Sequence, residues 1–284
     1  MRALDPEVKD AMWKMFEGLI PERPEAHPYG GHRRRLPDRY CFDAMVTRLV
    51  TGCSWEDACR LNGNRVSDTT VRERRDEWIE AGIFEAIESE ALAAFDRIIG
   101  LELSDVSADG SLHKAPCGGE GTGKNPTDRG KLGWKWSILV DRYGIIVGVA
   151  IAPANRNDCV LLEATLEDMA RHGLVVDVET IHLDAGYDSA GVRKVLAAVG
   201  IDDAVIAHRR RAGEPKPATM PSLGLRWVVE RTNSWLSNFG QLRRNNDRRI
   251  VHRRAHLGLA MAFLLTAKLI DWRNRWDPKT PQNH

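Results

Sequence analysis

Three acidic residues stand far apart in this chain, each at a position where a carboxylate can do chemistry. Asp109 closes a short apolar-alternating run that breaks at Gly110, and Asp184 follows the apolar run Thr180 to Leu183 in the same way. Glu230 lies in a later stretch with helical periodicity, LRWVVERTNSWLSNF. Hard divalent cations take oxygen ligands, and a pair of Mg²⁺ ions needs carboxylates from several elements. The three residues are therefore candidate metal ligands.

Each acid also has an ordinary structural interpretation. An Asp before a Gly is typical of a turn, which would account for Asp109 and for Asp184 before Ala185 and Gly186. Helical periodicity places an apolar stripe, Leu225 to Phe239, on one side of the later helix. Glu230 falls on the opposite side with Arg226, Asn233 and Ser237, where it would close a metal site or stay in solvent beside Arg226.

The elements that must position these acids follow from the periodicity, which changes from helical to strand-like at Leu101. The segment Lys114 to Lys131 is polar and Gly-rich, which is typical of a loop. The predicted elements are, in order, a strand Leu103 to Asp109, a hairpin of Trp134 to Asp141 with Gly144 to Ala152, a helix capped by Asp158 and running to about Arg171, a strand Thr180 to Leu183, a helix Ser189 to Val199, a strand Ala204 to Ala207 and the helix with Glu230. This order predicts an α/β fold with a mixed sheet flanked by helices, in which right-handed crossovers bring Asp109 and Asp184 side by side.

The first hundred residues are predicted to be all helical. Helices are expected over Asp38 to Leu49, Ser54 to Leu61, Val66 to Ala81 and Glu85 to Ile99. Ser54 and either Ser67 or Asp68 are plausible N-caps. Two short helices joined by a tight turn resemble a helix-turn-helix, whose second helix would read a DNA groove with Thr69, Thr70, Arg72, Arg74 and Arg75. The alternative is a packing helix with a solvated arginine face.

Composition indicates an ordinary soluble chain of 284 residues with a formal net charge of +1. Basic residues nevertheless cluster in His208 to Arg211 and in Arg243 to Arg254, and such strips suit phosphates. Five cysteines without a C-x-x-C pair indicate a reducing cytosol. The run Leu257 to Ile270 is shorter than the ~20 residues of a membrane span and is expected to be a buried helix. We therefore expect a cytoplasmic, nucleoid-associated protein and no membrane.

One motif is misleading. The letters GGEGTGK at Gly118 to Lys124 nearly match a nucleotide-binding phosphate loop, but Asn125 replaces the hydroxyl residue that would hold Mg²⁺. The polar segment Ser111 to Pro116 stands where a buried strand is required, and Pro126 follows where a helix should begin. Nucleotide hydrolysis is therefore not expected.

Four runs together resemble a known family, the DDE-type insertion-sequence transposases of the insertion sequence five group. They are NPTDRGKLGWKWSILVD, GIIVGVAIAPANRND, HLDAGYDS and RWVVERTNSWLSNFGQLRRNNDRR. The resemblance covers about Thr51 to Trp272 and implies a ribonuclease H-like catalytic domain over residues 99–284 behind a helical DNA-binding domain over 1–98. It implies Asp109, Asp184 and Glu230 as the metal-binding acids, with Asp109 bridging two Mg²⁺ (or Mn²⁺) ions. Leu223 stands where the family has an accessory Tyr and Ser237 where it has a Lys, which Arg243 or Arg244 would replace.

The implied function is that of a DNA transposase. It would bind double-stranded DNA at terminal inverted repeats and at a target, as a homodimer or higher oligomer, and would cleave and join phosphodiesters by two-metal-ion catalysis. The predicted contacts with DNA are Thr69, Arg72, Arg74, Arg75, Arg129, Lys131, Arg226, Arg243, Arg244, Arg248 and Arg249. Two alternatives stay open at this point: a catalytically inactive DNA-binding regulator, and a ribonuclease H-like nuclease without strand transfer.

Overall fold

The computed structural model describes residues 2–22, 35–207 and 226–276. The predicted basic cluster His208 to Arg211 and the accessory position Leu223 lie outside these residues. Two compact units form: one takes Met1–Ile99, Asn238–Leu242 and Val251–His284, and the other takes Gly100–Ser237 and Arg243–Ile250. The last long helix is thus grouped with the N-terminal helices, because its Phe263 packs against Phe42. The division into domains at residues 98 and 99 stays a prediction.

The first unit is helical throughout its described part. Its elements are η1 (Arg2–Leu4), α1 (Pro6–Leu19), α2 (Asp38–Thr51), α3 (Trp55–Leu61), α4 (Asp68–Glu80), α5 (Ile83–Ile98), α9 (Gly240–Arg243) and α10 (Ile250–Trp276). Ser54 and Ser67 cap α3 and α4, because their side chains accept hydrogen bonds from the backbone N–H of Asp57 and Thr70. These two predicted caps are confirmed.

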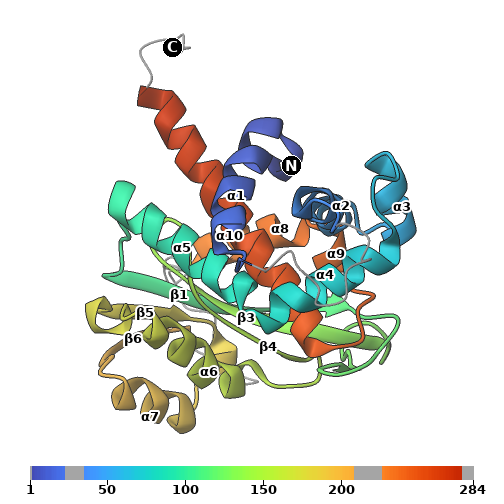
Figure 1. The fold of residues 1–284 in the computed structure, drawn as a ribbon. Coiled ribbons are helices and arrows are strands. Elements are labelled where there is room, and N and C mark those ends of the chain that lie inside the picture. The colour runs from blue at the N-terminus through green and yellow to red at the C-terminus, as the bar shows by residue number, and fades with distance from the viewer. Residues whose placement is uncertain (1, 23–34, 208–225, 277–284) are drawn as a thin grey trace. The chain divides into compact units, whose positions relative to one another are not determined.

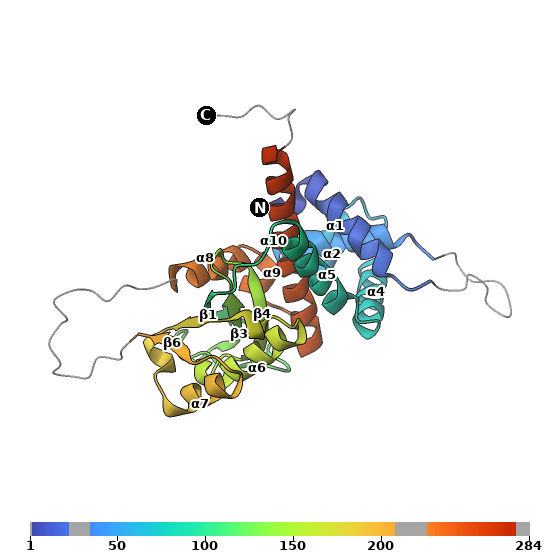
Figure 2. The same ribbon diagram turned by 90° about the vertical axis from the view of Figure 1, so that its left-hand side faces the viewer.

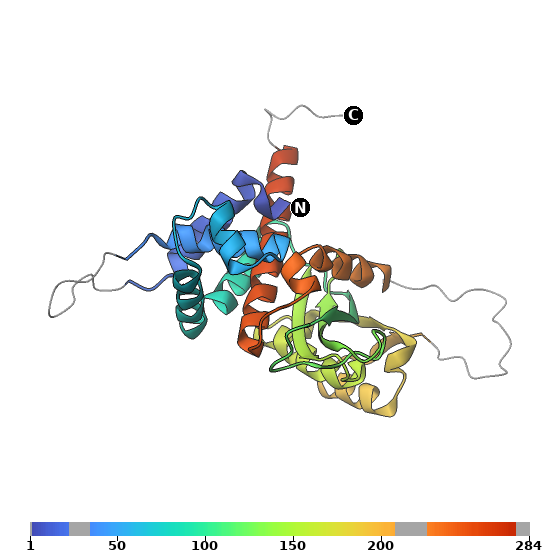
Figure 3. The ribbon, with the colours of Figure 1, turned by 90° about the vertical axis from the view of Figure 1, so that its right-hand side faces the viewer.

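Aromatic packing holds this unit together. Phe16 lies 5.1 Å from Phe42 and 4.8 Å from Trp78, measured between ring centroids, and so joins α1, α2 and α4. The helix α10, red in Figure 3, enters the same core, since Phe263 stacks on Phe42 at 6.3 Å. Its Arg254 pairs with the buried Glu88 of α5 at 2.6 Å.

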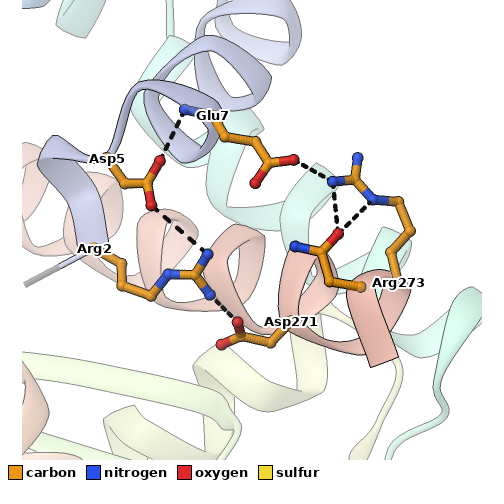
Figure 4. Close-up of polar contacts among 6 residues, drawn as sticks. Arg2, Asp5, Glu7, Asp271 and Arg273 are labelled. Atoms are coloured by element: carbon orange, nitrogen blue, oxygen red, sulfur yellow. Dashed lines mark hydrogen bonds and ion pairs between the residues drawn. The ribbon is translucent and has the colours of Figure 1, made fainter. Parts of the chain in front are cut away.

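Polar contacts join the N-terminal elements η1 and α1 to the C-terminal part of α10 (Figure 4). Arg2 contacts Asp271 of α10, and Arg273 of α10 contacts Glu7 of α1. These side chains are half-exposed, so the pairs add little stability. Among the described residues α10 alone has the length and composition to cross a membrane, but it is mostly buried. It is therefore the buried helix expected for Leu257 to Ile270, extended on both sides.

The second unit is a mixed sheet with helices on both faces. Its elements are β1 (Asp105–Lys114), β2 (Gly123–Lys124), β3 (Leu132–Val140), β4 (Ile146–Pro153), α6 (Asp158–Arg171), η2 (Val175–Asp177), β5 (Thr180–Leu183), η3 (Ala185–Tyr187), α7 (Ala190–Ala198), β6 (Asp203–Ile206) and α8 (Arg226–Ser237). The strands β1, β3 and β4 are antiparallel, and β5 and β6 continue the sheet parallel to β1. The predicted mixed sheet flanked by helices is thus confirmed: an antiparallel half is followed by parallel strands that alternate with helices.

The two faces of the sheet are covered by different helices. In Figures 1 and 2, α8 lies on one side of the sheet and α6 and α7 on the other. The pleat distributes the side chains accordingly, since neighbours along a strand point to opposite faces. Ser137 of β3 faces α6, where its hydroxyl meets Thr165 at 2.9 Å, whereas Trp136 faces α8 and bonds Asn233 at 2.8 Å.

Three local predictions are corrected in this unit. The first strand does not end at Asp109, because β1 stays paired with β3 as far as Lys114. Gly110 marks a close approach instead of a turn: a Cβ on it would lie 2.0 Å from Oδ1 of Asp158. The cap of α6 is Asn157, whose side chain accepts from the Cys159 N–H, and Asp158 is the first helical residue. The polar loop also contains the short strand β2.

Candidate active site

The register between β1 and β5 brings the first two predicted acids to one level. The strands run parallel, with Ser107 of β1 opposite His182 of β5. This is the last parallel pair, and Asp109 and Asp184 each lie two residues beyond it. The ends of such strands are where a ligand has space beside a fixed side chain.

Asp109 is partly buried on the face of the sheet that α8 covers. Burial is the main cause that raises the pKa of its carboxyl to about 6. The charges of Asp184 and Asp158 also raise this pKa, whereas the hydrogen bond from the Gly110 backbone N–H and the charge of Arg226 lower it. Nδ2 of Asn233 donates to Oδ2 of Asp109 at 3.2 Å. The carboxylate therefore sits among other acids and is held by an amide.

Asn233 was expected on the solvent side of its helix, and the structure contradicts this. It is buried, because it satisfies two partners in the sheet: it donates to Asp109 and accepts from Nε1 of Trp136. The packing face of α8 thus includes this polar residue along with Val228, Val229 and Leu236. Helical periodicity alone gave no signal for it.

Asp184 and Tyr187 form the second side of the site. Oδ1 of Asp184 accepts from the Gly186 backbone N–H at 2.7 Å, so the expected Asp-Ala-Gly turn is present and fixes the carboxylate. Tyr187 is buried, and its hydroxyl has no hydrogen-bond partner among the described residues. Burial raises the pKa of Tyr187 well above its ordinary value, and the charges of Asp158, Asp109 and Asp184 raise it further. The buried hydroxyl group therefore lies in the field of three carboxylates.

Asp158 is the functional candidate that the sequence analysis missed. It was expected only to cap a helix, but its Oδ1 lies 2.7 Å from Nζ of Lys135, a buried residue of β3. The same ammonium donates to the backbone carbonyl of Arg156 at 3.0 Å. A lysine inside a strand that is otherwise apolar was the one available signal, since a buried lysine needs a counter-charge.

Glu230 is placed differently from the two aspartates. Its side chain is 61% exposed and pairs with Arg226 at 3.6 Å. Among the described residues, the three predicted acids do not bring their ligand oxygens within 4.8 Å of one another. The structure thus brings Asp109 and Asp184 to one level of the sheet, and the charges of Asp158 and Arg226 act on Asp109. Glu230 pairs with Arg226. Its role as third ligand stays a prediction.

The predicted recognition helix presents only part of its basic face. Thr69 and Arg72 are exposed, and Arg72 pairs with Asp68. Arg74 is buried against Asp38 and Glu77, and Arg75 lies buried over the ring of Trp55. These two arginines hold helices together, so the expectation that they belong to an exposed DNA-binding face is not met.

The remaining predicted DNA contacts belong to the second unit. Arg226 is half-buried in its pair with Glu230. Six others are exposed on loops and at the end of α9: Arg129, Lys131, Arg243, Arg244, Arg248 and Arg249. Exposed arginines in irregular segments suit phosphate oxygens, because their donors are free to turn outward.

Comparison with known proteins places this arrangement in a family. Residues 102–265 match the family model described as "Transposase DDE domain". The chain belongs to the DDE transposases. Residues 8–88 match a second model, "Putative transposase of IS4/5 family", so this transposase also has the N-terminal part of an insertion-sequence group.

Two relatives come from Burkholderia cepacia. The transposase is 34% identical over 134 residues to "Putative transposase for insertion sequence element IS402", a match that covers 45% of this chain and 60% of that relative. It is 25% identical over 121 residues to "Insertion element IS402 uncharacterized 16.2 kDa protein", covering 43% and 82%. The first match thus spans less than two thirds of its relative's length.

Among solved structures, the transposase matches the catalytic domain of Mos1 mariner transposase. The sequence identity is 12%, the match covers 65% of this chain and 92% of that one, and the TM-score is 0.26.

Proposed function

We propose that this DDE transposase binds the terminal inverted repeats of an insertion sequence and catalyses metal-dependent DNA cleavage and strand transfer. The observation that supports the proposal is the parallel register of β1 and β5, since Asp109 and Asp184 each follow its last pair by two residues. Membership of the family supports the use of a divalent metal.

The donor groups fit Mg²⁺ or Mn²⁺. They are oxygens only, and the buried Tyr187 hydroxyl among them lacks a partner within the described part of the chain. Asp109 and Asp184 would hold the metal, with Glu230 as the third acid. Two bound ions would supply Lewis-acid activation of the attacking oxygen and neutralise charge at the scissile phosphate.

The chain's own residues do the positioning. Asn233 orients the Asp109 carboxylate through its hydrogen bond, and the turn at Asp184 holds the second carboxylate through the Gly186 N–H. Thr69 and Arg72 on α4 would contact duplex DNA, and the exposed arginines of the second unit would bind backbone phosphates. We expect a homodimer or higher oligomer to hold two DNA ends together.

The test uses a plasmid that carries the coding gene with its native flanks. The purified transposase with Mg²⁺ should produce 3′-hydroxyl ends at the borders of inverted repeats and then insert them into a second plasmid. Asp109→Asn, Asp184→Asn and Glu230→Gln should abolish cleavage and leave the gel shift of flank DNA unchanged. Glu163→Gln, which alters an exposed acid of α6, is the matched control.

The outcomes separate the alternatives. DNA binding without cleavage in Mg²⁺ or Mn²⁺ would identify an inactive regulator, an alternative that the exposed position of Glu230 favours. Cleavage without insertion would identify a nuclease. If Glu230→Gln cleaves normally and Asp158→Asn does not, the third ligand is wrongly assigned.

A further inference from the structure

The Gly-rich segment Cys117–Lys124, whose letters imitate a nucleotide-binding loop, lies against the chain between α9 and α10. The N–H of Glu120 donates to the carbonyl of Arg248 at 2.7 Å. The side chain of Glu120 accepts from the N–H of Ile250 at 3.1 Å and so caps the first residue of α10. One residue of the segment therefore fixes two points of the chain that follows α9.

Gly119 explains why this segment needs glycine. Its φ is +101°, a conformation that side chains disfavour, and a Cβ there would lie 2.2 Å from the carbonyl oxygen of Arg248. The two backbones touch at this point. Gly119 thus lets two backbone segments of this chain pack against each other, and phosphate binding is not needed to explain why the position is a glycine.

The other end of the docked chain is fixed by β1. The N–H of Asn245 donates to the carbonyl of Lys114 at 2.9 Å, and Lys114 forms a parallel bridge with Arg244. Asn245 is fully buried and accepts from the N–H of Asp247 through Oδ1. The stretch from Arg244 to Arg249 is therefore anchored at both ends although it is not helical.

We call residues 243–249 the arginine strip. Because their backbone is anchored, some of their side chains are held buried and others are held exposed. Asn245 and Asp247 are buried, whereas Arg243, Arg244, Arg248 and Arg249 are exposed. Lys114, next to the strip, has 64% of its side chain exposed and its Nζ lies 3.8 Å from Oδ2 of Asp128. Four exposed arginines thus share one backbone support, and a regular polyanion is the partner whose charge complements them.

We propose that the Gly-rich segment is the support that preorganises the arginine strip as a contact surface for the phosphates of duplex DNA. The choice of DNA as the partner rests on the proposed function. A fixed strip binds more tightly than a free one, because less conformational freedom is lost on binding. The segment supports the strip from behind and takes no nucleotide of its own in this role.

Two substitutions of Glu120 test whether this residue supports the arginine strip, because a charge effect and a supporting role predict different changes in DNA affinity. Glu120→Gln removes a negative charge but keeps an oxygen that accepts from Ile250; Glu120→Ala removes both. If Glu120 acts by charge alone, both variants bind a random-sequence duplex more tightly than the wild type. If it holds the strip, Glu120→Ala binds about tenfold more weakly than Glu120→Gln, the size expected when one or two long side chains lose fixed positions. Its salt slope should also fall by about 1 for each phosphate that the strip no longer neutralises.

Gly119→Ala and Gly130→Ala form a matched pair for the docking contact. Both glycines have positive φ, but a Cβ on Gly130 meets nothing within 4 Å. Gly119→Ala alone should speed hydrogen exchange of the Asn245 and Ile250 amides and weaken DNA binding, with thermal unfolding recorded to confirm that both variants fold. Equal exchange in the two variants, or equal affinity of the two Glu120 variants, overturns the proposal. Neither readout needs cleavage, so an inactive wild type would remove the proposed catalysis and leave this test intact.

Discussion

Asn233 of α8 donates from Nδ2 to Oδ2 of Asp109 in the middle of β1, at 3.2 Å. The same amide accepts from Nε1 of Trp136 on the neighbouring strand at 2.8 Å. One buried side chain thereby connects the helix to two strands and fixes the orientation of the central carboxylate. Amide groups with both partners satisfied are stabilising, and they are costly to remove.

Asn233→Ala should therefore destabilise the transposase and impair cleavage together. The indole N–H of Trp136, which is fully buried, would lose its acceptor, at a cost of about 1–3 kcal/mol. Urea unfolding measures this change, and the rate of Mg²⁺-dependent cleavage measures the loss of orientation at Asp109. Ser234→Ala, at an exposed position of the same helix, is the control. Equal stability of the two variants would contradict the role given to Asn233.

The pKa of Asp109 predicts a pH-dependent stability. Because its folded pKa of about 6 lies above the ordinary 3.8, its contribution is fully present below pH 3.8 and is lost as the pH rises through about 6. Asp109→Asn stays neutral, so it should become more stable relative to the wild type with rising pH, by up to about 3 kcal/mol. Urea unfolding without metal from pH 4 to pH 8 measures the difference, with Glu163→Gln as reference. A difference that does not change with pH would show that Asp109 titrates normally.

Much of the second unit could be predicted from local patterns. The strand Thr180–Leu183 has the predicted bounds, and the hairpin and α6 also form, because alternation and turn residues specify them locally. The end of β1 could not be predicted. Gly110 resembles a turn signal, and only the pairing with β3 and the approach of Asp158 reveal why it is a glycine.

The candidate site shows the same limit. Asp184 could be found because the end of β5 is visible in the sequence, and Asp109 was found through a break at Gly110 that is not a strand end. Asn233 and Asp158 gain their roles from partners distant in the chain, Trp136 and Lys135. Helical periodicity treats every polar residue as solvent-facing and cannot identify a polar residue with buried partners.

The two arginines of α4 that were expected to behave alike should separate experimentally. Arg72 is exposed, so Arg72→Ala should weaken DNA binding and change stability by less than about 0.5 kcal/mol. Arg74 is buried against Asp38 and Glu77, so Arg74→Ala should cost about 1–3 kcal/mol, since Arg35 still pairs with both acids. Gel shifts and thermal unfolding of the two variants make the comparison. If Arg74→Ala lost DNA binding without a change in stability, Arg74 would belong to the DNA-binding face of α4.

Lys135 and Asp158 should be coupled in their effect on the free energy of unfolding, and Asp158 should also affect the pKa of Asp109. Asp158→Asn leaves the buried ammonium of Lys135 without its counter-charge, which should cost about 3 kcal/mol, and Lys135→Met in the same chain should recover most of it. A double-mutant cycle by urea unfolding measures the coupling. Because the charge of Asp158 raises the pKa of Asp109, Asp158→Asn should also move the acid limb of the cleavage profile to lower pH. Absence of coupling would contradict the pairing of Asp158 with Lys135. If the limb stays in place while stability falls, Asp158 does not act on the site and serves only as the partner of Lys135.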